Sequence, residues 1–136
     1  MTPPGLLVLR SPHAPATTVD RLAAAIASHG MTIMARIDHA AAAQDAGLAL
    51  RPTMLLIFGN PRAGTLLMQQ AQTIGIDLPL KALVWQDDQN RTWIGYNDPH
   101  WLAARHAVAA DAIVETMRHT LATIAQETVT ADSAIA

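Results

Sequence analysis

The chain reads Thr53-Met54-Leu55-Leu56-Ile57-Phe58-Gly59-Asn60-Pro61-Arg62-Ala63-Gly64-Thr65 where an apolar segment stops abruptly at a polar one. Apolar residues occupy both alternating positions before Gly59, which is the pattern of a strand buried on both faces. Asn60 and Pro61 then favour a helix start, because asparagine accepts an orphan amide and proline has no amide to leave unpaired. We therefore predict a central strand over residues 52–58 that leads directly into a helix.

Further strands are predicted on both sides of this junction. Apolar or alternating runs occupy residues 6–9, 33–37, 80–85 and 92–96. Residues 87–90 lie between the last two runs and have the composition of a hairpin tip. The register that this turn suggests pairs Trp85 with Thr92 and Val84 with Trp93. The two tryptophans are therefore expected on opposite faces of the sheet.

Helices are expected between several strands and near the end of the chain. The first follows the opening strand, with Thr17 or Thr18 as its cap. A short helix should start at Asp38 and run through an alanine-rich segment. A long amphipathic helix is predicted over residues 111–127, with its apolar stripe against the sheet, and residues 128–136 are expected to fray.

The predicted order is a strand, a helix, four strands with short helical insertions, and a long helix. This order is typical of an α+β fold with an antiparallel meander. With 136 residues, 51% of them hydrophobic, the chain has the size of one domain, taken as residues 1–136 with an ordered core at about 5–127. A sheet that is apolar on both faces needs a second cover in a chain this short. A homodimer is the simplest solution.

Composition excludes several classes of function. The chain contains no cysteine, which rules out disulfides, thiolate metal sites and cysteine nucleophiles. The net charge is −2 and Lys81 is the only lysine, so nucleic acid and anionic membranes are weakly attracted. The apolar runs are far shorter than the roughly 20 residues that span a bilayer, and no signal-peptide pattern opens the chain. We therefore expect a cytoplasmic protein without a nucleic-acid or membrane partner.

Several short motifs occur together. The chain contains Arg36-Ile37-Asp38-His39, Phe58-Gly59-Asn60-Pro61, Gly64-Thr65, Asp77-Leu78-Pro79-Leu80, Tyr96-Asn97-Asp98-Pro99 and Leu102-Ala103-Ala104-Arg105-His106. In this combination and spacing, the chain resembles the bacterial and archaeal family called domain of unknown function 302 (DUF302). The resemblance implies a fold like that of the TATA-box-binding protein (TBP-like), a curved antiparallel sheet crossed by helices in the order β-α-β4-α. It implies no particular reaction.

The junction after residue 58 supplies the first candidate ligand-binding residues. Gly59 would let a ligand approach the backbone, while Arg62, Thr65 and the helix start at Asn60 could attract a carboxylate or phosphate. Helix capping alone is the alternative explanation, because ordinary helix starts share these properties.

Charged residues at motif-matching positions are the other candidates. The resemblance includes Asp38 and His39, and an imidazole can change charge near neutral pH. Asp98 precedes a proline, and the planar guanidinium of Arg105 could meet a ligand carboxylate or pair with Asp77 or Asp98. The structural alternatives are a helix cap beside a surface histidine, turn chemistry and an ion pair.

No catalytic constellation is apparent in the sequence. The six histidines lack the spacing of a helical metal site, and no serine lies in a Gly-x-Ser-x-Gly elbow. No metal is therefore predicted, and any cofactor is unknown. The preferred hypothesis is a non-catalytic homodimer that binds a small anionic or hydrophobic ligand, or a protein partner. The alternative is a small acid–base enzyme acting on a carboxylate-bearing metabolite, using His39 with Asp38 nearby, together with Asp98 and Arg105.

Overall fold

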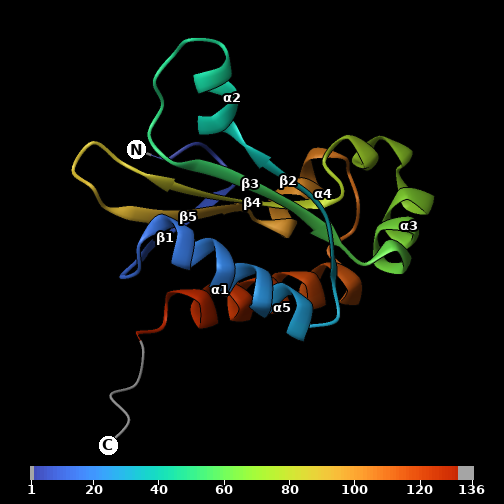
Figure 1. Ribbon diagram of the computed structural model, residues 1–136. Coiled ribbons are helices and arrows are strands. Elements are labelled where there is room, and N and C mark those ends of the chain that lie inside the picture. Colours follow the sequence, from blue (N-terminus) through green and yellow to red (C-terminus); the bar gives the residue numbers. More distant parts are fainter. Residues whose placement is uncertain (1, 132–136) are drawn as a thin grey trace, which may run out of the picture.

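One antiparallel sheet organises the chain in the computed structural model, which describes residues 2–131 (Figure 1). The strands are β1 (Leu6–Ser11), β2 (Thr32–Asp38), β3 (Thr53–Gly59), β4 (Leu80–Gln86) and β5 (Thr92–Asn97). Their order across the sheet is β1-β5-β4-β3-β2, which places β4 at the centre. The expected α+β fold with an antiparallel sheet is confirmed.

Two long helices lie side by side and cover one face of this sheet (Figure 1). The helices of the chain are α1 (Pro15–Ser28), α2 (His39–Asp45), α3 (Pro61–Gln70), the 3-10 helix η1 (Gln72–Ile76), α4 (Pro99–Arg105) and α5 (Ala112–Val129). Leu22 and Ile26 of α1 and Ile124 of α5 pack with Leu56 and Ile94 of the sheet. Each of these side chains is at most 2% exposed. Because burial of such a side chain contributes roughly 1.5–3 kcal/mol, this face forms the main core.

A second, smaller core closes one end of the sheet. α3, η1, α4 and the start of α5 meet there around Leu67, Ile74, Ala103 and Val114. Met117 of α5 contacts both this cluster and the main core. The junction between β3 and α3 therefore lies where the two cores adjoin.

The opposite face of the sheet carries apolar side chains that belong to neither buried core. Residues that pair across neighbouring strands have their side chains on the same face of the sheet, and successive residues along a strand alternate between the two faces. The pairs Leu55–Leu83 and Trp85–Trp93 therefore lie on the face opposite to α1 and α5. We call this surface the open face; it comprises Val8, Ile37, Leu55, Ile57, Leu83, Trp85 and Trp93. These residues are half-buried or exposed in the single chain.

The hairpin between β4 and β5 differs from the predicted register. Trp85 pairs directly with Trp93, so the two tryptophans share the open face and the prediction of opposite faces is wrong. The reason is a turn that is one residue longer than predicted, since Gln86 pairs with Thr92 and not with Arg91. Asn90 adopts a left-handed conformation (φ 62°) that accommodates the additional residue, and the Asp87 amide donates to the Arg91 carbonyl at 2.9 Å across the base of the turn.

The Asp87 carboxylate holds this turn together. It accepts hydrogen bonds from Trp93 Nε1, from Arg91 Nε and from the Gln89 and Arg91 amides, each at 2.9 Å. The Trp93 hydrogen bond and those from Arg91 and Gln89 hold the pKa of Asp87 well below its usual range. The ionised carboxylate therefore stabilises the fold at pH values above the ordinary aspartate pKa of about 4, and this contribution declines as the pH falls below it.

Asp87→Asn is expected to lower the free energy of unfolding at pH 7, because the new amide group would place a donor against the donors of Arg91 and Trp93. The variant should also lose stability less steeply than the wild type between about pH 5 and pH 2. Urea denaturation across this range measures both effects. Asp88→Asn is the matched control, since Asp88 is exposed in the same turn. Parallel pH profiles for wild type and Asp87→Asn would contradict this role.

The starts of the first two helices agree with the sequence in part. Asp38 caps α2 by accepting from the Ala41 amide at 2.9 Å, as predicted. The predicted threonine cap of α1 is wrong, because this helix begins at Pro15 without a side-chain cap. Thr18 lies inside its first turn, fully buried, and its hydroxyl is 2.7 Å from that of Ser11.

The last helix begins as expected and runs slightly further. Asp111 caps α5 by accepting from the Ile113 and Val114 amides, and a hydrogen bond from Gln70 helps to lower the pKa of the Asp111 carboxyl. The helix continues to Val129, where the sequence suggests a frayed end. The rest of that expected tail, residues 132–136, lies outside the described residues.

Candidate functional site

A pocket of about 240 Å³ lies at the junction between β3 and α3. It is lined by Met31, Met34, Gly59, Asn60, Pro61, Ala63, Gly64, Thr65, Met68, Leu78, Pro79, Leu80 and Met117. The structure thus brings together three of the residues singled out from the sequence, namely Gly59, Asn60 and Thr65.

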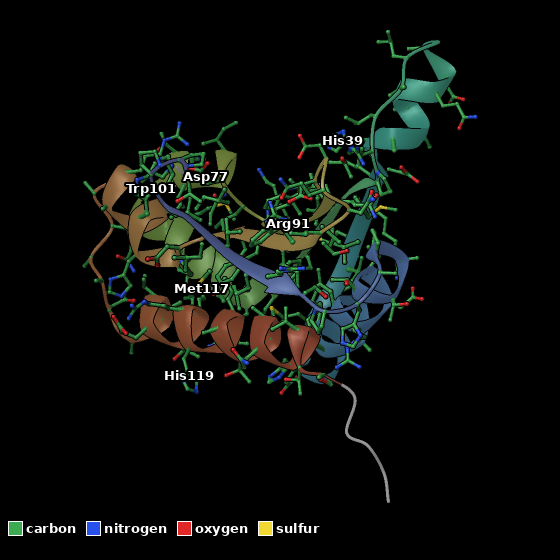
Figure 2. The ribbon with its side chains drawn as sticks, turned by 90° about the vertical axis from the view of Figure 1, so that its left-hand side faces the viewer. His39, Asp77, Arg91, Trp101, Met117 and His119 are labelled. Carbon is green, nitrogen blue, oxygen red and sulfur yellow. The ribbon has the colours of Figure 1, made fainter. Side chains whose placement is uncertain are left out.

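Four methionine side chains form much of the wall of this pocket. Met31 lies just before β2 and Met34 within it, while Met68 comes from α3 and Met117 from α5. Figure 2 places Met117 between α5 and the sheet. Thioether side chains are flexible and polarizable, so they adapt to apolar ligands of different shape. Met34 is 47% exposed, which leaves an apolar side chain open to solvent at this pocket.

Two glycines in the wall have no local structural reason to be glycine. Neither Gly59 nor Gly64 has a positive φ. A Cβ atom at Gly59 would come no closer than 3.6 Å to Pro79, and one at Gly64 no closer than 3.8 Å to Leu78, which are ordinary contacts. Gly64 lies within α3, where glycine costs about 1 kcal/mol relative to alanine. Both glycines line the pocket, and neither is required there by its backbone conformation or by a close neighbour.

Two polar side-chain groups of the junction form hydrogen bonds within the chain. Asn60 Oδ1 accepts from the Arg62 amide at 3.0 Å, and the Thr65 hydroxyl donates to the Pro61 carbonyl at 2.7 Å. The Arg62 side chain faces a separate hollow between α3 and α5. Because these two groups are engaged internally and most of the other lining side chains are apolar, this pocket is better suited to an apolar ligand than to an anion.

Asp38 and His39 lie elsewhere, at the start of α2. α2 has no buried residue and stands away from the rest of the molecule (Figure 1). Asp38 caps that helix and also lines a wider groove of about 740 Å³ between α2, the start of α1 and the edge of the sheet. His39 is exposed. Figure 2 shows it at the opposite end of the molecule from Asp77.

Asp98 and Arg105 occupy the two ends of α4. Asp98 caps the helix by accepting from the His100 amide at 3.0 Å. Burial raises the pKa of the Tyr96 hydroxyl, and the negative charge of Asp98 adds to this shift. Arg105 donates from Nη1 to both carboxylate oxygens of Asp77 at 2.8 Å. Neither Asp98 nor Arg105 lines the methionine-lined pocket.

A polar cluster that was not predicted from the sequence joins η1 to the end of α4. Asp77 Oδ2 lies 2.5 Å from His106 Nε2, and His106 Nδ1 lies 2.9 Å from the hydroxyl oxygen of Thr73. Together with Arg105, these side chains form a continuous hydrogen-bonded chain. An ion pair of Arg105 with Asp77 is one of the expected alternatives. No local sequence pattern indicates the role of His106, because His106 lies 29 residues after Asp77 in the sequence.

Within residues 2–131, no three His, Asp or Glu side chains are grouped so that they could hold a metal ion. In the same part of the chain, no helix has the length and apolar character needed to cross a membrane.

The family model described as "Domain of unknown function DUF302" matches residues 7–126. The chain belongs to the DUF302 family. This match includes nearly the whole sheet and confirms the resemblance inferred from the motifs. A crystal structure of an uncharacterized conserved DUF302 protein from Bacillus stearothermophilus aligns with a TM-score of 0.83, covering 93% of this chain and 99% of that one. At 20% sequence identity, this likeness shows a common DUF302 fold.

Three curated relatives carry the name of a fluoride-specific ion channel. The chain is 48% identical over 115 residues to "Fluoride-specific ion channel FluC 1" of Brucella suis biovar 1 (strain 1330), which is 83% of this chain and 45% of the relative. FluC 1 of Brucella abortus biovar 1 (strain 9-941) and FluC 2 of Brucella melitensis biotype 1 (strain ATCC 23456) match with the same identity over 43% of their lengths. The matched segment is therefore less than half of each named protein.

Proposed function

We propose that this DUF302 chain is a homodimeric binding domain whose pocket at the β3–α3 junction holds a small hydrophobic ligand. The observation that carries the proposal is the pair Gly59 and Gly64, which leave space in a methionine-lined wall without a backbone or packing requirement. The residues that line the pocket include no titratable side chain, which favours binding over catalysis at this site.

Two apolar surfaces support the homodimer. The open face presents Leu55, Leu83 and both tryptophans of the hairpin without a covering core. The segment after α2 exposes Leu48 (69%) and Leu50 (51%). Contiguous apolar surface of this kind is typical of an interface. A second copy of the chain is the partner that is always present at matching concentration.

The acid–base enzyme remains a weaker alternative because its proposed residues are separated. His39 lies on α2, while Asp98 and Arg105 lie on α4 at the other end of the molecule. The channel name of the Brucella relatives belongs to proteins of which the matched segment is less than half. The name is therefore no reason to propose channel activity for this chain.

Gly64→Ala is expected to stabilise the protein by up to about 1 kcal/mol, because alanine favours the helix and its methyl group meets no close neighbour. The same methyl group should weaken binding of a small apolar probe by about tenfold, since it takes up space in the pocket. Benzene is a suitable probe, because it binds dry apolar cavities of about 150 Å³. The measurements are urea denaturation and NMR titration of methyl-labelled methionines.

In the wild type, benzene should shift the methyl resonances of Met31, Met68 and Met117. Met54 is the internal control, because it lines the groove beside α2 and not this pocket. Gln69→Ala on the exposed side of α3 is the control substitution and should leave binding unchanged. Equal shifts at Met54 and at the pocket methionines, or unchanged binding in Gly64→Ala, would contradict the pocket assignment.

A further inference from the structure

The cluster at the end of α4 contains a carboxylate, an imidazole and a hydroxyl in sequence. Asp77 Oδ2, His106 Nε2, His106 Nδ1 and Thr73 Oγ1 follow one another at 2.5 Å and 2.9 Å separations. This is the order of acid, base and nucleophile in triads that activate a hydroxyl group. Such arrangements are recognised by geometry and not by sequence position.

The proton positions follow from the donors and acceptors. An ionised carboxylate only accepts hydrogen bonds, so the ring nitrogen next to Asp77 carries the proton. In the neutral imidazole, His106 Nδ1 is then a bare acceptor, and the Thr73 hydroxyl is the donor in their 2.9 Å contact. His106 is therefore set to receive the Thr73 proton.

The surroundings fix the base and leave the hydroxyl accessible. The side chains of His106 and Asp77 are 8% and 13% exposed, whereas Thr73 is exposed on η1. Arg105 holds both oxygens of Asp77, which prevents the carboxylate from turning away from the ring. Asp77 lies at the end of the molecule near Trp101 (Figure 2).

We propose that Thr73 is an acyl-accepting nucleophile, with His106 as its general base and Asp77 as the residue that orients His106. The site is separate from the methionine-lined pocket and goes beyond the binding function proposed above. Thr73 Oγ1 bonds to the carbonyl carbon of an ester while its proton moves to His106 Nδ1. The bond from that carbon to the leaving oxygen then breaks, and the alcohol departs with the proton.

The expected substrate is a small activated ester. The methionine-lined pocket and the groove beside α2 are lined by neither Thr73 nor His106. The acyl group therefore has to reach Thr73 from open solvent, which favours a short acyl chain on a good leaving group. Water can then release the acid by the same route: His106 accepts a proton from the water that bonds to the acyl carbon, and returns it to Thr73 Oγ1 as the bond between that carbon and Oγ1 breaks.

The test is incubation of the full chain with p-nitrophenyl acetate, followed by peptide mass spectrometry. One acetyl group is expected on Thr73. His106→Gln should slow this acetylation by about 100-fold or more, which is the range of general-base catalysis. Thr73→Ser should retain acetylation at residue 73, and Thr73→Val should abolish it.

The matched control is Thr53, whose hydroxyl donates to the Arg51 carbonyl at 2.9 Å and has no imidazole partner. Acetylation of Thr73 at the same rate as Thr53 in the wild type would overturn the proposal. If His106→Gln fails to fold, two other results still test the proposal. One is the comparison of the acetylation rates of Thr73 and Thr53 in the wild type. The other is the behaviour of Thr73→Ser and Thr73→Val, which leave the residues Asp77 and His106 in place.

Discussion

Leu55→Lys is expected to raise the dissociation constant of the proposed homodimer by at least about 100-fold while each protomer stays folded. Leu55 lies at the middle of the open face, paired with Leu83 of β4 and Ile37 of β2. In a twofold dimer each substitution occurs twice, so two ammonium groups would lose water without a carboxylate partner. In the separated protomer, the long lysine side chain can reach solvent from a partly exposed position.

Sedimentation velocity over a concentration series measures this effect. Gln69→Lys introduces the same charge on the exposed side of α3 and should leave the dimer intact. Circular dichroism checks that both variants are folded. A wild-type chain that sediments as a monomer at tens of micromolar, or a Leu55→Lys dimer of unchanged affinity, would refute the open face as an interface.

Local pattern made most of this fold predictable. The apolar run that stops at Gly59, followed by Asn60 and Pro61, identifies β3 and the start of α3 because strand burial and helix capping both act over a few residues. The same holds for the caps at Asp38 and Asp111. These features depend on neighbouring residues only.

The register of the β4–β5 hairpin was not predictable in this way. Turn length decides which residues pair, and here it depends on a carboxylate that gathers donors from Trp93 and Arg91. A shift of one residue moves a side chain to the other face. The predicted positions of Trp85 and Trp93 were therefore wrong even though the hairpin itself was correct.

The candidate site, too, was predictable from the sequence only in part. Gly59, Asn60 and Thr65 meet in one pocket because they belong to one strand–helix junction. The methionines that complete it come from β2 and α5 as well, and only tertiary packing brings them there. Thr73, Asp77 and His106 likewise meet because η1 packs near the end of α4, an arrangement that no spacing in the sequence indicates.

Phe58→Ala is expected to lower the free energy of unfolding by about 3–5 kcal/mol, because it removes a ring from a packed core and leaves a cavity. Phe58 is 1% exposed and points toward the main core, whereas the preceding Ile57 points to the open face. Ile57→Ala should lower the free energy of unfolding of the separated protomer by less than Phe58→Ala does. It should instead weaken the proposed dimer.

Urea denaturation at low protein concentration and sedimentation at high concentration separate these two effects. Phe58→Ala should lower the free energy of unfolding measured by urea denaturation. It should leave the dissociation constant of the remaining folded protein nearly unchanged. Ile57→Ala should show the reverse pattern, because its side chain is partly exposed until a second copy covers it. Equal losses of unfolding free energy in the two variants would mean that β3 is covered on both faces within one chain, and the argument for a dimer from its two apolar faces would fail.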